Sequence, residues 1–120
     1  MKAGDVAALA LAASGLAIAL MPERTLVQLE LTPDSARGIT ETRAGLGGTF
    51  AGLGLWALAR GSADAYTAVG MTWLGAAVFR TYSLRVDQPE TKPSYWAYLA
   101  GETTLGLAGV LARRRTAESC

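Results

Sequence analysis

The sequence predicts an all-α fold, a bundle of four transmembrane helices that forms one membrane-embedded domain over residues 1–120. Its apolar residues gather in four long blocks, and no block shows the polar stripe that a solvent-facing helix needs. A soluble bundle of this length cannot bury every face of four helices. The outer faces are therefore expected to meet lipid, unless the chain sits inside a larger assembly. The helices are expected at about residues 4–21, 33–60, 63–85 and 94–113.

The first apolar block, 6–21, contains one polar residue, Ser14. Lys2 followed by an apolar run is also the pattern of a signal peptide. However, Asp5 occupies a place where a signal peptide is positively charged, and no clear small-x-small cleavage site precedes Pro22. The segment is therefore predicted to be a retained first helix.

The second helix has a start signal at Thr32-Pro33-Asp34, which combines an N-cap residue, a proline at the first helical position and an early acid. From there the apolar pattern runs to Arg60. The preceding residues 23–31 mix apolar side chains with charged and polar ones. They can be interpreted as an amphipathic segment on the membrane surface or as a loop, and the loop is preferred.

The third helix is expected to begin at Ser62 and to run to about Arg85, and the fourth is expected to begin after Pro93 and to end at residues 113–115. The strictly apolar part of each block is shorter than the ~20 residues that a membrane span needs. The flanking residues lengthen the helices enough to cross.

The charges predict the topology. Arg113, Arg114 and Arg115 favour the cytoplasmic side by the positive-inside rule. With four spans, Lys2 and the turn at 60–64 share that side. The sequence therefore predicts a multi-pass inner-membrane protein with both termini in the cytoplasm.

Composition excludes several classes of function. The chain has no histidine and one cysteine, Cys120, so it cannot build a Cys/His zinc site, an internal disulfide or a histidine-based catalytic centre. Its net charge of +1 gives no basic footprint for nucleic acid. No cofactor is expected. A divalent cation bound by carboxylates is conceivable but poorly motivated, because Arg80 would compete for the same oxygens, so no metal is expected either.

Two of the predicted helices share the motif E-T-x-x-G-L-x-G, which begins at Glu41 and again at Glu102. The two glutamates lie at similar distances after helix-starting prolines, Pro33 and Pro93. The repeat suggests two helical hairpins related by duplication. Chance similarity in a chain rich in glycine, leucine and threonine is an equally good explanation.

The ionisable residues inside the predicted spans fall in one layer. A lone charge within a membrane costs several kcal/mol, so Glu41, Arg80 and Glu102 are expected to face inward and to pair. The side of the second helix that carries Glu41, Gly48 and Gly52 is accordingly expected to face the bundle. The side with Gly47, Ala51 and Gly54 is left for a partner or for a second copy of the chain.

A polar centre in an apolar surrounding is typical of a small-molecule site. We expect such a site to bind a membrane lipid or another lipophilic small molecule. Two neighbouring carboxylates of unequal pKa also suit acid–base isomerisation, cyclisation or epoxide opening without a cofactor. The candidate catalytic residues are Glu41, Arg80, Glu102 and Asp87, and the candidate ligand-binding residues are Arg43, Tyr82, Tyr98, Trp73 and Tyr95.

Two other functions stay open at this point. The Glu/Arg cluster suits a structural salt bridge that sets helix register without adding much stability. The glycine-rich helix surfaces suit a homo-oligomer or an accessory subunit of a larger membrane complex.

The motifs resemble a bacterial family known as domain of unknown function 4345. The resemblance rests on E-x-R-A-x-x-G-G from Glu41, on R-T-Y-S-L from Arg80 followed by Asp87, and on Glu102, and it covers about residues 36–112. It implies a small four-helix protein of a bacterial membrane and brings no known activity. The family pattern has glycines at the positions of Phe79 and Gln88.

Overall fold

The computed structural model describes the backbone of residues 1–118 and the side chains of residues 1–112. The regular structure of this part of the chain is entirely helical, which confirms the all-α class. The elements are α1 (Ala3–Leu20), α2 (Pro22–Gln28), α3 (Ala36–Glu41), the π-helix η1 (Thr42–Gly48), α4 (Thr49–Arg60), α5 (Ala63–Val86) and α6 (Pro93–Glu118). The side chains of Arg113–Arg115 and the whole of Cys120 lie outside the described residues.

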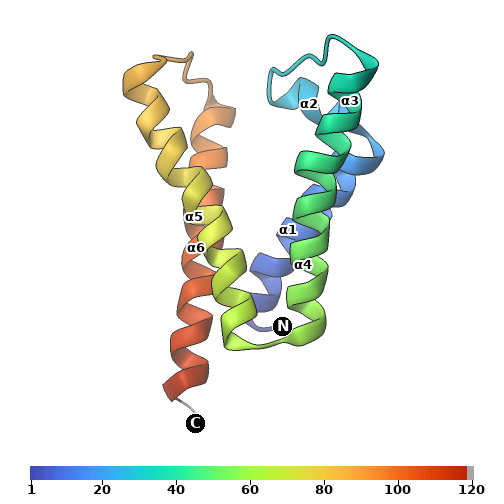
Figure 1. Ribbon diagram of the computed structural model, residues 1–120. Helices are drawn as coiled ribbons and strands as arrows, with labels where there is room; N and C mark the ends of the chain where they lie inside the picture. Colours follow the sequence, from blue (N-terminus) through green and yellow to red (C-terminus); the bar gives the residue numbers. More distant parts are fainter. Residues whose placement is uncertain (119–120) are drawn as a thin grey trace.

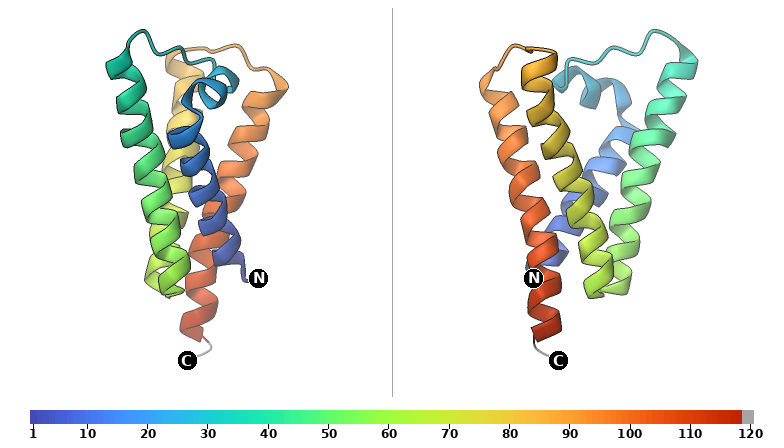
Figure 2. Two further views of the ribbon diagram at one scale, coloured as in Figure 1. Left: turned by 90° about the vertical axis from the view of Figure 1, so that its right-hand side faces the viewer. Right: turned by 60° about the vertical axis from the view of Figure 1, so that its left-hand side comes forward.

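The long helices form two pairs, α1 with α4 and α5 with α6, and α1 connects the two pairs. Helix α1 packs along η1 and α4, α5 packs along α6, and α1 also contacts α5 and α6 (Figure 1). The start of α1, the last turn of α6 and the turn between α4 and α5 lie at one end of the molecule (Figures 1 and 2). Helix α2 and the loop at 87–92 lie at the other end, toward which the two pairs diverge (Figures 1 and 2).

The boundaries of α1 and α5 agree with the prediction to within one residue, whereas α6 continues beyond its predicted end at 113 to Glu118. Ser62 caps α5, because its Oγ accepts a hydrogen bond from the backbone N–H of Ala65 at 3.2 Å. The start of the second long helical segment was predicted three residues too early. There Ser35 is the N-cap, and its Oγ accepts from the N–H of Gly38 at 3.0 Å. The preference for a loop at 23–31 was wrong for its first part, which is helix α2.

Glycines bring α1 and α4 into backbone contact. A Cβ added to Gly15 would lie 2.2 Å from the backbone nitrogen of Ala51. A Cβ on Gly54 would lie 2.5 Å from the nitrogen of Ala12. Such close approach is typical of small-residue packing between helices in membranes.

The side of α4 that faces α1 is the opposite of the one predicted. Gly47, Ala51 and Gly54 are buried against α1, whereas nothing lies within 4 Å of a Cβ built on Gly45 or Gly52. The prediction assumed uniform α-helical spacing across residues 41–52. The π-helix η1 bonds i to i+5 and so takes more residues for each turn, which rotates the residues before it relative to α4.

Among the described helices, α1 is the one that is long and apolar enough to cross a membrane, with a mean hydropathy of 1.8 over its 18 residues. A buried core helix or a signal sequence would meet the same criterion. The structure therefore supports the helical part of the predicted fold, and four membrane crossings stay a prediction.

At the end of the molecule that holds both termini, α1 and α5 are tied together. The hydroxyl of Tyr66, which is 4% exposed, donates a hydrogen bond to Asp5 Oδ1. Around this contact the core is made mainly of small residues, with Leu11 and Val69 as its largest fully buried side chains. Small side chains explain how the four helices approach so closely here.

The backbone contact between α1 and α4 predicts opposite effects for two glycine substitutions. Gly15→Ala should lower the free energy of unfolding by about 1–3 kcal/mol, because the helices must separate to admit the methyl group. Gly52→Ala, on the open side of α4, should raise it by up to about 1 kcal/mol through helix propensity. Unfolding by a denaturing detergent in mixed micelles measures both. Equal effects of the two variants would contradict the packing.

Candidate functional site

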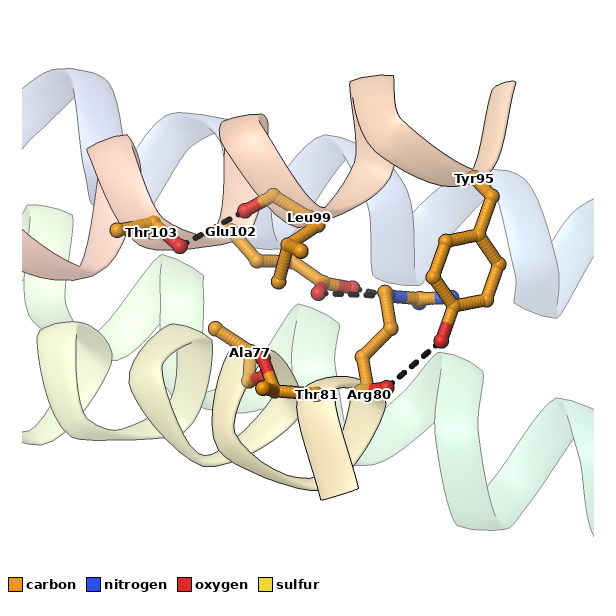
Figure 3. Close-up of polar contacts among 7 residues, drawn as sticks. All are labelled: Ala77, Arg80, Thr81, Tyr95, Leu99, Glu102 and Thr103. Atoms are coloured by element: carbon orange, nitrogen blue, oxygen red, sulfur yellow. Dashed lines mark hydrogen bonds and ion pairs between the residues drawn. The ribbon is translucent and has the colours of Figure 1, made fainter. Parts of the chain in front are cut away.

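A buried ion pair joins α5 and α6. The Nε of Arg80 donates to Glu102 Oε2 at 2.8 Å, and its Nη2 donates to Oε1 at 2.7 Å (Figure 3). The side chain of Glu102 is 8% exposed and that of Arg80 is 26% exposed. Among residues 1–112, Glu102 is the one charged residue that is buried. The two-point geometry is the strong form of an arginine–carboxylate contact.

Two tyrosines hold Arg80 from the side of α6. The hydroxyl of Tyr95 donates to the backbone oxygen of Arg80 at 2.6 Å (Figure 3). The guanidinium carbon of Arg80 lies 5.5 Å from the ring centroids of both Tyr95 and Tyr98, within cation–π range. Tyr95, Tyr98 and Glu102 follow helical spacing along α6. The structure therefore brings four of the predicted site residues together.

Glu41 is not part of this centre, so the predicted Glu41–Arg80–Glu102 arrangement was wrong. Its side chain is 60% exposed, and its Oε1 pairs with Arg37 one turn earlier. Glu41 ends α3, and the change of helical phase in η1 directly after it explains why it does not face inward with α4.

Two further predicted site residues, Arg43 and Asp87, make their contacts away from the ion pair. The Nη1 of Arg43 donates to the backbone oxygen of Ala19 at 2.6 Å, in the last turn of α1. Asp87 is exposed at the end of α5, where its Oδ2 accepts from the hydroxyl of Ser83. Neither side chain is in a contact with the Arg80–Glu102 pair.

The remaining two aromatic candidates also lie elsewhere. Tyr82 is 60% exposed and packs edge-on against Phe79, with 6.2 Å between the ring centroids. The indole Nε1 of Trp73 donates to the backbone oxygen of Ala7 at 3.1 Å, so Trp73 joins α5 to α1 in the core. Trp73 and Arg80 are seven residues apart, which puts them on one face of α5. Two helical turns separate them along the helix, so Trp73 lies against α1 and not at the ion pair.

A groove leads away from the ion pair between α1, α2 and α6. A small cavity of about 60 Å³ is lined by Arg80 and Tyr98 together with the end of α2 and the residues around Lys92. A larger hollow of about 400 Å³ adjoins it. Its lining residues are Ala13, Ser14, Ala17, Ile18, Thr25, Gln28, Leu29 and Tyr98. The two spaces are adjacent, because Gln28, Leu29 and Tyr98 line both of them, and we call them together the groove. Arg80 lines the smaller space, which is the polar end.

The α1 and α2 walls of this groove were missed from the sequence. Ala13, Ala17 and Ile18 look like ordinary core positions of an apolar helix. The useful signal was the amphipathic character of residues 23–31, because a helix there covers the end of α1 and presents Leu29 to the groove.

An ion pair lies beside the polar end of the groove. The Nζ of Lys92 lies 2.8 Å from Glu30 Oε1 and 3.7 Å from Glu90 Oε2. The hydrogen bond from Lys92 to Glu30 raises the pKa of the lysine above its ordinary value, so Lys92 keeps its charge to a higher pH than a free lysine. The contact connects the loop before α6 to the end of α2.

Arg80 has hydrogen-bond donors that its ion pair does not use. Two of the five N–H donors of Arg80 are used by Glu102, which leaves donors at the groove. Both oxygens of Glu102 accept from the cation, and no second carboxylate is paired with Arg80 in the described part of the chain. No group of three or more metal-ligating residues occurs among the described residues.

No family model, no curated protein and no solved structure matches the chain. The resemblance to domain of unknown function 4345 therefore stays a prediction.

The ion pair predicts unequal effects of its variants. Arg80→Gln should destabilise the protein by about 3–5 kcal/mol, because it leaves the Glu102 carboxylate buried without a cation. The double variant Arg80→Met/Glu102→Leu should recover most of that loss, since no buried charge remains. Unfolding in mixed micelles measures the free energy of unfolding of the wild type, of Arg80→Gln and of the double variant.

Arg37→Gln is the matched control, because the Arg37–Glu41 pair is exposed. It should change the free energy of unfolding by less than about 1 kcal/mol. A double variant no more stable than Arg80→Gln would show that the destabilisation does not come from an unpaired charge.

Proposed function

We propose that the chain is a small integral membrane protein with four spans. Large apolar side chains remain exposed on every long helix, among them Leu16, Leu55, Phe79 and Leu107. Exposed apolar surface of this extent is typical of contact with lipid or with a partner protein. The start of α1 and the last turn of α6 lie at one end of the bundle, as an even number of crossings requires (Figures 1 and 2). By the charge distribution and the family resemblance, we place it in a bacterial inner membrane with that end in the cytoplasm.

The function that we infer is the binding of a lipophilic small molecule. The observation that carries it is the groove between α1, α2 and α6 that ends on Arg80 and Tyr98. A mostly apolar hollow with a few polar groups at one end is the usual layout of a small-molecule site. The apolar part of the ligand would lie against Ala17 and Ile18, with its polar end near Arg80.

The charges around the polar end favour a ligand with an uncharged head. Arg80 is paired with Glu102, and Lys92 is paired with Glu30 and Glu90. Two cations and three anions give this end a net charge of −1, so an anionic head has no free partner. A hydroxyl or carbonyl group can accept a hydrogen bond from the donors of Arg80 that Glu102 does not use.

Binding is better supported than conversion of the ligand. Acid–base chemistry would need a proton donor and a separate base in reach of the ligand. Glu41 is paired with Arg37 outside the groove, and both oxygens of Glu102 are held by Arg80. The carboxylates that line the polar end, Glu30 and Glu90, are both paired with Lys92. We therefore propose a non-enzymatic binding protein.

The other candidate function is that of a structural or accessory subunit in a membrane complex. The observation that favours it is the complete pairing of Glu102, as expected of an ion pair that only joins two helices. The two functions differ in whether the groove takes up a ligand.

A photoactivatable fatty alcohol with a diazirine in its chain tests the binding. Cross-links in detergent-extracted protein should map to α1 around Ala17 and to α6 around Tyr98, the two walls of the groove. Ala17→Phe should reduce the yield at least fivefold, because the ring fills the hollow. Peptide mass spectrometry after irradiation measures the positions and the yield of the cross-links.

Leu16→Phe is the matched control, because Leu16 is the neighbouring residue on α1 and does not line the groove. It should leave the yield unchanged. Labelling spread evenly over the exposed apolar residues, or equal in both variants, would refute the binding function and favour the accessory subunit.

A further inference from the structure

A second polar hollow lies at the end of α1 and shares no lining residue with the groove at Arg80. Its volume is about 290 Å³, and it is lined by Leu20, Met21, Pro22, Glu23, Arg24 and Arg43. Two arginines from separate elements, α2 and η1, therefore border one space.

Arg43 is held in place at this hollow. Its Nη1 donates to the backbone oxygen of Ala19, one of the last carbonyls of α1 that have no partner within the helix. This contact uses one of its five N–H donors. The others, and the exposed guanidinium of Arg24, are available to a ligand. With Glu23 as the one acidic residue of the lining, the net charge is +1.

Apolar side chains adjoin the two arginines. Leu20 is 71% exposed and Met21 is 49% exposed, and both line the same hollow. Leu20 is also the last residue of α1, the helix that is long and apolar enough to cross a membrane. Cations directly beyond the apolar end of a span lie at the depth of lipid phosphates.

We propose that the hollow binds the phosphate of a membrane phospholipid between Arg24 and Arg43. The acyl chains would lie along Leu20 and Met21. Two guanidinium groups match the oxygens of a phosphodiester, which arginine recognises by paired hydrogen bonds. The proposal rests on the membrane location proposed above, and it does not depend on a ligand in the groove.

Titration with a short-chain phosphatidylglycerol in a neutral detergent tests the site. Arg24→Gln should weaken binding about tenfold, because it removes a charge-assisted contact and no structural one. Glu23→Gln should tighten binding, since it removes the one repelling carboxylate. Arg43→Lys should weaken it less than Arg24→Gln, because the charge is kept. Tryptophan fluorescence or native mass spectrometry provides the binding curve.

Arg85→Gln is the matched control, because Arg85 is an exposed arginine in the last turn of α5 that does not line the hollow. Helix α5 ends at the same end of the molecule as α2 (Figure 1). Equal weakening by Arg24→Gln and Arg85→Gln would overturn the site in favour of general surface attraction. Inorganic phosphate that binds as tightly as the lipid would overturn the assignment to a lipid. Release of the protein from membranes by alkaline carbonate without detergent would refute the membrane location itself.

Discussion

The ion pair between Arg80 and Glu102 is the interaction on which the proposed site depends. A carboxylate that is 8% exposed would be very unfavourable without its cation, so the pair fixes how α5 and α6 meet near the diverging end of the bundle. It also fixes the guanidinium, which Tyr95 and Tyr98 border at 5.5 Å. Arg80 also lines the small cavity at the polar end of the groove. A structural contact thereby provides a polar end to an apolar hollow.

Backbone contact elsewhere determines where the groove is found. Glycines let α1 approach α4, and they let α5 approach α6, until no side chain separates them. Backbone contact with η1 continues to Ala19, in the last turn of α1. The groove lies on another side of α1, where Ala13, Ala17 and Ile18 border an open space together with Leu29 and Tyr98.

Helix ends and the buried pair could be predicted from the sequence. Ser62 and Pro93 are local signals with direct physical causes, and the cost of a lone charge in an apolar helix predicted that Arg80 and Glu102 would meet. The partnership with Glu41 could not be predicted correctly, because it required the phase of a helix that changes at η1. Spacing along a sequence gives the faces of a regular helix and does not reveal a π-helical segment. The groove depended on α2, whose short amphipathic stretch suits a loop equally well.

Native mass spectrometry of gently extracted protein tests the central claim most directly. The wild type and Leu16→Phe should each carry one discrete adduct that is neither detergent nor phospholipid, and Ala17→Phe should lack it. The mass of that adduct would identify the ligand and should fit a lipophilic molecule with an uncharged polar group. The same bare protein in all three samples would contradict a ligand site at Arg80 and leave the ion pair as a structural contact.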